Sequence, residues 1–349
     1  MIVERADNLM ITVSSKKNSA KFPFIYQNFS GKPAKNNGKM TSLYAGRNGT
    51  PLYGVRFMDP EKRLRLLKSH IDRMTPLSPT VTKVITICNQ RDTSPADVSK
   101  IISVDPVLMA KVLRLINSAY YGLPQKVTSI VRAIIMLGIN TVKNMLLSTA
   151  VMSTLANRRN FNALEMVEFW KHSLAVGVTS KLIAKKHRLP PEIQEEYFIG
   201  GLLHDIGKIP LNNRFSEEYH QALNLSEDTH QPLYLAENQM MGTNHALVGK
   251  LIAENWNLGS DIADTICQHH SESSYQGDNR QLVYVITLSD YLVNTLNIGY
   301  SGNAHPMDID KEVLSYLSSH MDVSYGNLKS VVKDIKQEIE RAQIFLKVS

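Results

Sequence analysis

The stretch Gly201-Leu202-Leu203-His204-Asp205-Ile206-Gly207-Lys208 places an imidazole and a carboxylate side by side in apolar surroundings. His204 and Asp205 can bind one metal ion together, and the diverging oxygens of Asp205 can also bridge two ions. Lys208 lies four residues after His204, so a continuous helix would place its ammonium group on the same face. Such a cation could contact a phosphate group bound to the metal ions. A His-Asp pair alone is more often a structural feature of a helix than a metal site, so the rest of the chain has to decide.

Further imidazole and carboxylate groups occur on both sides of this stretch, each within a helical pattern. They are Glu168, His172, His245, His269, His270 and Asp290. Glu168 and His172 share a helix face because they are spaced i, i+4. Asp290 lies in an apolar helical segment, where an unpaired carboxylate is costly to bury. A surface ion pair, a polar helix end and a helix-facing hydrogen bond explain these groups singly, whereas a metal centre explains them together.

The apolar periodicity after Pro60 predicts an all-α body. Ser94-Pro95-Ala96-Asp97 has the pattern of a capping box with proline in the first turn of a helix. Further helices are predicted over residues 163–187, 191–208, 233–255, 260–269 and 282–296, with two more within 309–346. Before residue 60 the sequence is largely irregular, with short strand-like pieces at Met10–Val13 and Leu52–Phe57.

The chain order of the His and Asp residues resembles that of the HD superfamily of metal-dependent phosphohydrolases. From about residue 77 to residue 292 the chain further resembles the HDOD domain, a signalling branch of that superfamily. The features that carry this resemblance are Leu77-Ser78-Pro79, Ile101–Pro106, Leu113–Gly122, Ala133–Gly138, Phe169–Ser173 and Trp256. The resemblance implies an all-α fold in which a compact helical HDOD domain has two lobes.

The resemblance, combined with the helical pattern, gives the expected domain organisation. Residues 1–60 form a basic, largely irregular arm, residues 61–300 the HDOD domain, and residues 301–349 a helical extension. Within the domain, residues 61–157 form the first lobe and residues 158–300 the lobe that carries the metal site.

The resemblance also implies two groups of metal ligands. By similarity to binuclear HD enzymes, the first ion is held by His172, His204, Asp205 and Asp290. Asp205 would bridge to a second ion, whose other ligands are His245 and His269 or His270. Similarity to the HD-GYP branch adds Glu168 as a further ligand and Lys208 as a phosphate contact. The chain lacks the Gly-Tyr-Pro signature after its paired histidines, so the resemblance does not extend to cyclic di-GMP as the substrate.

Imidazole and carboxylate donors favour divalent transition metals over Mg²⁺ or Ca²⁺. We expect two such ions, iron or manganese first, with zinc, nickel and cobalt as alternatives. Bound metal ions lower the pKa of water and neutralise charge on a phosphate group. In an enzyme of this kind Asp205 and Lys208 would be the catalytic residues, and the substrate would be a phosphorylated small molecule or nucleotide.

Two functions fit these expectations, because membership of a fold family does not confer activity. One is a regulatory or metal-sensing module of bacterial signal transduction that binds partner signalling proteins without turnover. The other is an active metal-dependent phosphohydrolase or phosphodiesterase. A remote third is a DNA-binding regulator, since residues 130–147 loosely resemble a helix-turn-helix. Nucleic acid is the least favoured partner, because the second helix of that segment carries Lys143 as its one cation. The oligomeric state is not predicted.

The net charge of +7 is concentrated before residue 60, where nine Lys and Arg residues face three Asp and Glu residues. Such an arm can bind nucleic acid or an acidic membrane, although a solvated tail is commoner. No apolar run approaches the roughly 20 residues of a membrane helix, and we expect no signal peptide. The two cysteines, Cys88 and Cys267, suit a reducing compartment. We therefore expect a cytoplasmic protein.

Overall fold

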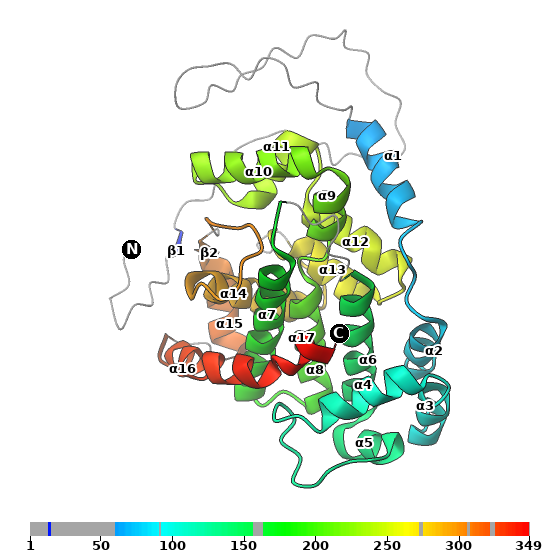
Figure 1. The fold of residues 1–349 in the computed structure, drawn as a ribbon. Helices are drawn as coiled ribbons and strands as arrows, with labels where there is room; N and C mark the ends of the chain where they lie inside the picture. Colours follow the sequence, from blue (N-terminus) through cyan, green and yellow to red (C-terminus); the bar gives the residue numbers. More distant parts are fainter. Residues whose placement is uncertain are drawn as a thin grey trace, which may run out of the picture.

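The computed structural model describes residues 13–14, 60–90, 92–155, 163–271, 275–305, 308–321 and 325–348. These residues form an all-α fold, as predicted, with α7 and α8 at its centre (Figure 1). Of the strand-like pieces predicted before residue 60, Leu52–Phe57 lies outside the described residues. Val13, the last residue of the other piece, begins the short strand β1 (Val13–Ser14).

Among the residues that the structure describes, six helices precede residue 156. They are α1 (Pro60–Ile71), α2 (Pro79–Cys88), α3 (Pro95–Ile102), α4 (Pro106–Ile116), α5 (Ile130–Leu137) and α6 (Ile139–Leu155). The predicted capping box is confirmed, because Ser94 and Asp97 each accept a hydrogen bond from the backbone N–H of the other. Gly138 separates α5 from α6, and the two helices meet at 116°. Within the described residues no single helix is long and apolar enough to cross a membrane; only this bent pair reaches that length.

Among the described residues, eight further helices span 166–295, the part of the chain that contains the predicted site residues. They are α7 (Met166–Lys186), α8 (Pro191–Leu203), α9 (Lys208–Arg214), α10 (Ser216–Thr229), α11 (Leu233–Met241), α12 (His245–Asn255), α13 (Ser260–Gln268) and α14 (Arg280–Thr295). The backbones of α7 and α8 touch, since a Cβ atom on Gly201 would lie 2.7 Å from the Cα of Gly177. Helix α6 packs on α8 and on α2, which joins the first six helices to this central pair.

Two predicted helices are each split in the structure. The helix predicted over residues 191–208 ends at Leu203, and tight turns follow before α9 begins at Lys208. The helix predicted over residues 233–255 ends at Met241, where Gly242 has the left-handed conformation with φ of 67°. Asn244 then caps α12 by accepting a hydrogen bond from the N–H of Leu247. Both breaks lie next to predicted site residues, so they determine how the site is assembled.

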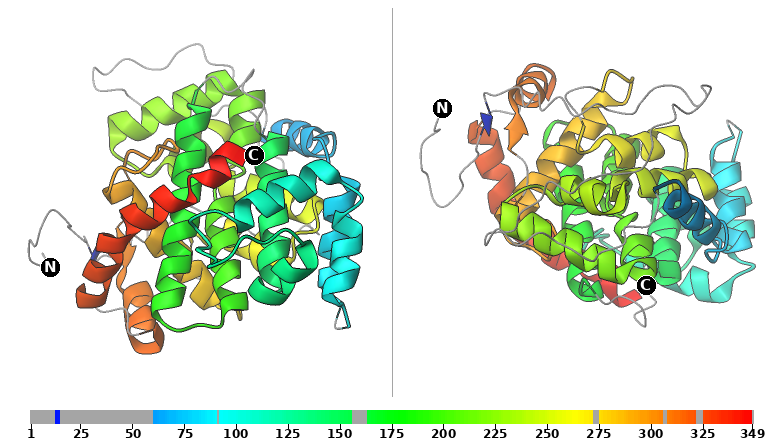
Figure 2. Two further views of the ribbon diagram at one scale, coloured as in Figure 1. Left: turned by 60° about the horizontal axis from the view of Figure 1, so that its bottom comes forward. Right: turned by 90° about the horizontal axis from the view of Figure 1, so that it is seen from above.

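The last helices pack onto the rest of the domain (Figure 2). They are α15 (Lys311–Met321), α16 (Tyr325–Ala342) and α17 (Ile344–Val348). The first two residues of the helical region predicted from residue 309 instead form β2 (Ile309–Asp310), which pairs in parallel with β1. Helix α16 lies along α7, and the Phe345 ring of α17 contacts the rings of Tyr120 and Phe198.

Candidate metal centre

The predicted His and Asp residues converge from five segments of the chain into one buried cluster. Helix α7 supplies His172, the turn after α8 supplies His204 and Asp205, α12 begins with His245, α13 is followed by His269 and His270, and α14 supplies Asp290. Asp290 is 8% exposed and His270 is half-buried, whereas the others are at most 1% exposed. The cluster therefore lies inside the protein and reaches solvent at these two residues.

The turn between α8 and α9 sets the positions of His204 and Asp205. Its backbone hydrogen bonds run from Ile206 N–H to Leu203 and from Lys208 N–H to Asp205, which makes it tighter than an α-helix. Gly207 allows α12 to approach, because a Cβ atom there would lie 1.9 Å from the carbonyl oxygen of His245. The same glycine thus brings the first residue of α12 against the turn that carries Asp205.

One group of potential ligand atoms surrounds Asp290. The Nε2 atom of His172 lies 3.0 Å from Asp290 Oδ1, and the Nε2 atom of His204 lies 3.6 Å from the same oxygen. Asp205 Oδ2 lies 3.3 Å from His204 Nε2 and 3.9 Å from His172 Nε2. His172, His204 and Asp290 lie close enough together to hold one metal ion.

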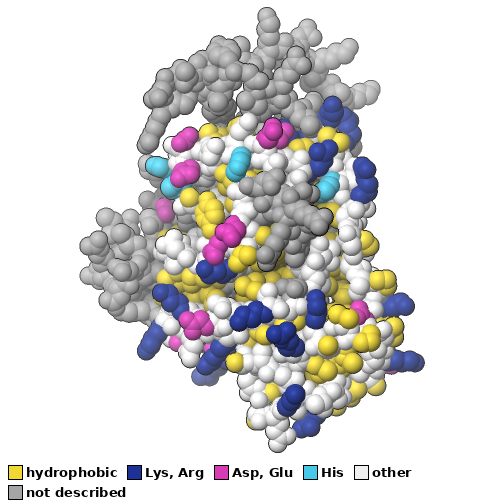
Figure 3. Space-filling model, viewed as in Figure 1, with side chains coloured by type: hydrophobic (Ala, Val, Ile, Leu, Met, Phe, Trp, Pro, Cys, Tyr) yellow, Lys and Arg dark blue, Asp and Glu magenta, His cyan; other side chains and the backbone are white. Residues whose placement is uncertain are grey.

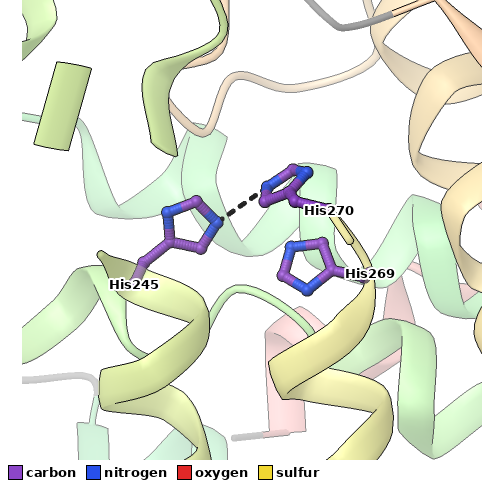
Figure 4. A group of neighbouring side chains, drawn as sticks. All are labelled: His245, His269 and His270. Atoms are coloured by element: carbon purple, nitrogen blue, oxygen red, sulfur yellow. Dashed lines mark hydrogen bonds between the residues drawn. The ribbon is translucent and has the colours of Figure 1, made fainter. Parts of the chain in front are cut away.

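A second group consists of His245, His269 and His270, whose rings face one another (Figure 4). The Nε2 atoms of His245 and His270 are 3.0 Å apart. Two nitrogens bound to one metal ion at about 2.1 Å each lie roughly 3.0–3.4 Å apart, so this spacing suits a shared ion. Asp205 Oδ1 lies 3.3 Å from His245 Nε2 and 3.8 Å from His269 Nε2. The two oxygens of Asp205 therefore face different groups.

Hydrogen bonds on the far side of the His204 and His269 rings direct their Nε2 atoms into the cluster. The Nδ1 atoms of His204 and His269 lie 2.7 Å from the carbonyl oxygens of Gly201 and Ile266. A carbonyl oxygen only accepts, so each Nδ1 carries a proton, and each Nε2 is the nitrogen left to bind a metal ion, at His204 after loss of its own proton. The Nε2 atoms of His204 and His269 are buried without a hydrogen-bond partner, as is Asp205 Oδ1. Transition metal ions fit this donor set, because between them they would satisfy all three atoms.

The charges of the cluster also favour a bound cation. Burial alone would raise the pKa values of Asp205 and Asp290, but the nearby imidazoles, joined at Asp205 by the ammonium group of Lys208, hold both well below the usual range. Burial lowers the pKa of His204, but the two carboxylates outweigh it and raise that pKa to about 10. Burial and the neighbouring imidazoles His204 and His245 lower the pKa of His269 to about 3. Two carboxylates thus draw positive charge into the cluster, which a proton or a metal ion can supply.

Lys208 reaches the cluster by a different route from the predicted one. It begins α9 instead of continuing the helix of His204, yet its ammonium group donates to Asp205 Oδ2 at 2.7 Å. The same ammonium donates to Ser301 Oγ at 3.1 Å, and Lys208 is 1% exposed. Ser301 lies 93 residues further along the chain, and no motif in the sequence marks it as a neighbour of Lys208.

The structure does not bring Glu168 into the cluster. Its side chain is 38% exposed and forms an ion pair of 3.3 Å with Lys171. Among the described residues, the groups able to hold a metal ion do not include Glu168. The i, i+4 spacing puts Glu168 and His172 one helical turn apart. The Glu168 side chain nevertheless pairs with Lys171, which precedes His172, at the protein surface.

Glu237 is a buried neighbour of the cluster that the sequence did not reveal. Its Oε2 atom lies 2.6 Å from His245 Nδ1 and accepts a hydrogen bond of 2.8 Å from the His245 N–H. The available signal was a carboxylate within an apolar helical segment, eight residues before His245.

Comparisons with known proteins agree with this fold. The structure of an HDOD domain protein of unknown function from Geobacter sulfurreducens is similar, with a TM-score of 0.66 and 25% sequence identity. The match covers 82% of this chain and 98% of that one. A candidate phosphohydrolase from Shewanella amazonensis SB2B is similar with a TM-score of 0.61 and 23% identity, over 80% of this chain and 97% of its own.

Sequence comparison identifies the family. An uncharacterized protein of Treponema pallidum (strain Nichols) is 22% identical over 282 residues, which are 80% of this chain and 53% of that protein. The chain thus spans about half the length of this curated relative. The HDOD domain matches residues 74–272, which is well over half of the chain and includes the whole cluster except Asp290. The chain therefore belongs to the HDOD domain family.

Proposed function

We propose that this HDOD protein binds two divalent transition metal ions and acts as a regulatory or metal-sensing module in bacterial signal transduction. The observation that carries the proposal is the position of Asp205, whose Oδ2 faces His204 and whose Oδ1 faces His245. A carboxylate whose two oxygens meet separate groups of ligands can bridge two ions. The first ion would be held by His172, His204, Asp205 and Asp290, and the second by Asp205, His245, His269 and His270.

Burial supports a regulatory role over turnover. A catalytic metal keeps a coordination position open to substrate, whereas a closed site holds its metal for structure or sensing. Only Asp290 and His270 give the cluster any contact with solvent. The ammonium group of Lys208 is already bonded to Asp205 and Ser301, which leaves it less free to bind a phosphate. Metal occupancy would fix α7, α12, α13 and α14 relative to one another, and a partner signalling protein could recognise that state.

The second candidate function is a metal-dependent phosphohydrolase or phosphodiesterase acting on a nucleotide or another phosphoester. The buried ammonium of Lys208 beside the shared carboxylate favours it, because such a cation can stabilise negative charge on a phosphate. Bound metal ions would supply an activated water nucleophile at neutral pH. In this function Lys208 would exchange its bond with Ser301 for a phosphate oxygen, and Asp205 would hold that ammonium in place.

Metal analysis combined with an activity assay tests the proposal. The full chain would be stripped with a chelator and loaded separately with Fe²⁺, Mn²⁺, Zn²⁺, Ni²⁺ or Co²⁺. Elemental analysis should find about two ions per chain with the preferred metal, and no turnover of a generic phosphodiester or a nucleotide panel. Asp205→Asn should abolish uptake, whereas Asp261→Asn, an exposed carboxylate, should leave it unchanged. Two bound ions with turnover would favour the phosphohydrolase, and no uptake of any metal would refute both.

A further inference from the structure

We propose that Glu237 is the positioning residue of the second metal subsite, where it fixes the ring and the tautomer of His245. The inference rests on the proposed function and extends it to a residue outside the ligand groups. It assigns to Glu237 a specific effect on one of the two ions, because the hydrogen bonds of Glu237 to the cluster go to His245, a ligand of the second ion.

A single oxygen of Glu237 holds both the backbone and the ring of His245. Oε2 accepts a hydrogen bond of 2.8 Å from the backbone N–H and lies 2.6 Å from Nδ1. His245 is the first residue of α12, so this N–H has no partner within its own helix. The break at Gly242 turns α12 back on α11 and allows the contact across eight residues. With its Nδ1 held as a donor, His245 presents the lone pair of Nε2 to Asp205 and His270.

The two hydrogen bonds to His245 do not by themselves require a negative charge on Glu237. Glu237 is 0% exposed, and apart from its bonds to His245 its carboxylate meets the hydroxyl of Tyr219, a donor without charge. Among the described residues, no Lys or Arg forms an ion pair with it, and its one ion-pair partner is the His245 ring. Burying a carboxylate without a cation is costly, whereas a neutral amide oxygen could accept the same two bonds. A metal ion on the opposite nitrogen of the ring would supply the missing positive charge.

His204, His245 and His269 each have a hydrogen-bond partner at Nδ1, and the nature of that partner makes them differ in strength as ligands. Neutral carbonyl oxygens support His204 and His269, whereas a carboxylate supports His245. A carboxylate on Nδ1 makes the opposite Nε2 atom more basic, and loss of such a partner typically weakens metal affinity about 10–100-fold. His245 is then the strongest imidazole donor of the second subsite, and the affinity of that subsite depends on Glu237.

The test compares metal binding by this chain and by its variants. Glu237→Gln keeps an oxygen that can accept both hydrogen bonds but removes the charge, and Glu237→Leu removes both. Glu195→Gln is the matched control, because Glu195 of α8 is also buried but pairs with Lys181 of α7. Titration with Co²⁺ alone, followed by its visible absorption spectrum and by calorimetry, reports the two ions separately. Nitrogen-15 NMR of the histidine side chains reports the tautomer of His245 without any metal.

We expect Glu237→Gln to lower the affinity for the second ion about 10–100-fold and to leave the affinity for the first ion within about twofold of that of the wild type. Glu237→Leu should lower the affinity for the second ion further, and the ring of His245 should no longer be held in its Nδ1–H tautomer. Glu195→Gln should change the affinity for neither ion. Equal affinities in the wild type and both Glu237 variants would overturn the inference while leaving the proposed function intact. Parallel weakening of both ions, with a lowered melting temperature, would overturn it in favour of a purely structural role. A wild-type chain that binds no metal would overturn the proposed function as well.

Discussion

The helices α2–α6 and the helices α7–α14 bury different kinds of polar group. Among the described residues of α2–α6, the buried polar side chains are uncharged, and three of them bond to carbonyl oxygens of the same helix or the adjacent turn. These are Thr141, Ser148 and Thr149. In α7–α14 and the turns between them, the core contains four histidines, three aspartate and glutamate residues of the cluster and its support, and one lysine. Such groups are costly to bury, so the second region gives up stability that the first region keeps.

The distribution of charge also differs along the chain, between residues 60–157, which include α1–α6, and residues 158–349. Residues 60–157 contain thirteen Lys and Arg against five Asp and Glu, whereas residues 158–349 contain seventeen against twenty-four. On the face shown in Figure 3, lysine and arginine side chains gather over α1. The near-neutral sum after residue 59 therefore hides a basic and an acidic half. An acidic half attracts cations toward the buried cluster, which agrees with a metal-binding role for that half.

The strongest test of this contrast removes the shared carboxylate. Asp205→Asn should abolish binding of both ions, because it weakens the donor on each side of the cluster. Asp290→Asn should affect only the first ion, since Asp290 lies next to His172 and His204. Elemental analysis after metal loading gives about two ions for the wild type, none for Asp205→Asn and about one for Asp290→Asn. Equal stoichiometry in the two variants would show that the groups do not act as separate subsites.

In the first region, a core substitution should change stability without changing metal binding. Leu115 is 0% exposed within α4, and Leu115→Ala should lower the free energy of unfolding by about 2–5 kcal/mol. The loss should be the same with and without metal, because α4 lies outside the cluster. Urea unfolding of both forms measures it. A loss that depended on metal would mean that the two regions are coupled more tightly than their cores suggest.

In the second region, metal should provide the stability that the buried charges lack. At a free metal concentration 100 times the Kd, binding to one site stabilises the folded protein by about 2.7 kcal/mol. Chelation should therefore lower the melting temperature of the wild type by several degrees, and re-addition of metal should restore it. Asp205→Asn should melt at one temperature under both conditions. Calorimetry at matched protein concentrations measures the shift, and a wild type insensitive to chelation would contradict the expectation.

Metal binding should also release a proton. The pKa of His204 is raised to about 10 in the metal-free cluster, so its ring is protonated at pH 8, whereas His269, with a pKa near 3, is already neutral. A metal ion on His204 must displace that proton, and metal affinity should therefore fall as the pH falls. Calorimetric titration at pH 8 in two buffers of different ionisation enthalpy counts the released protons. A binding enthalpy that did not depend on the buffer would show that metal binding releases no proton from the cluster.

Much of the cluster could be predicted because each ligand stands out within its own apolar helical pattern. Asp290 is the clearest example, since an acid among Val283–Leu292 needs a partner wherever the helix lies. The contacts of Ser301 and Glu237 could not be predicted, because both depend on which turns bring distant segments together. The break after Met241 was readable in part, as Gly242 and Asn244 are ordinary signals for the end and start of helices. Because the sequence pattern predicted one helix over residues 233–255, it missed the turn between α11 and α12 that lets Glu237 reach His245.

Glu168 gives the smallest expected effect and the sharpest limit on the family resemblance. The resemblance implies that Glu168 is a metal ligand, whereas the structure places its side chain 38% exposed and paired with Lys171. Glu168→Gln should therefore leave the stoichiometry unchanged and both affinities within about twofold, because an exposed ion pair contributes at most about 1 kcal/mol. His172→Gln, one helical turn away, should lose the first ion and serves as the positive control. If Glu168→Gln also lost that ion, metal binding would have to draw Glu168 inward from the surface, and the cluster would be assembled only in the metal-bound protein.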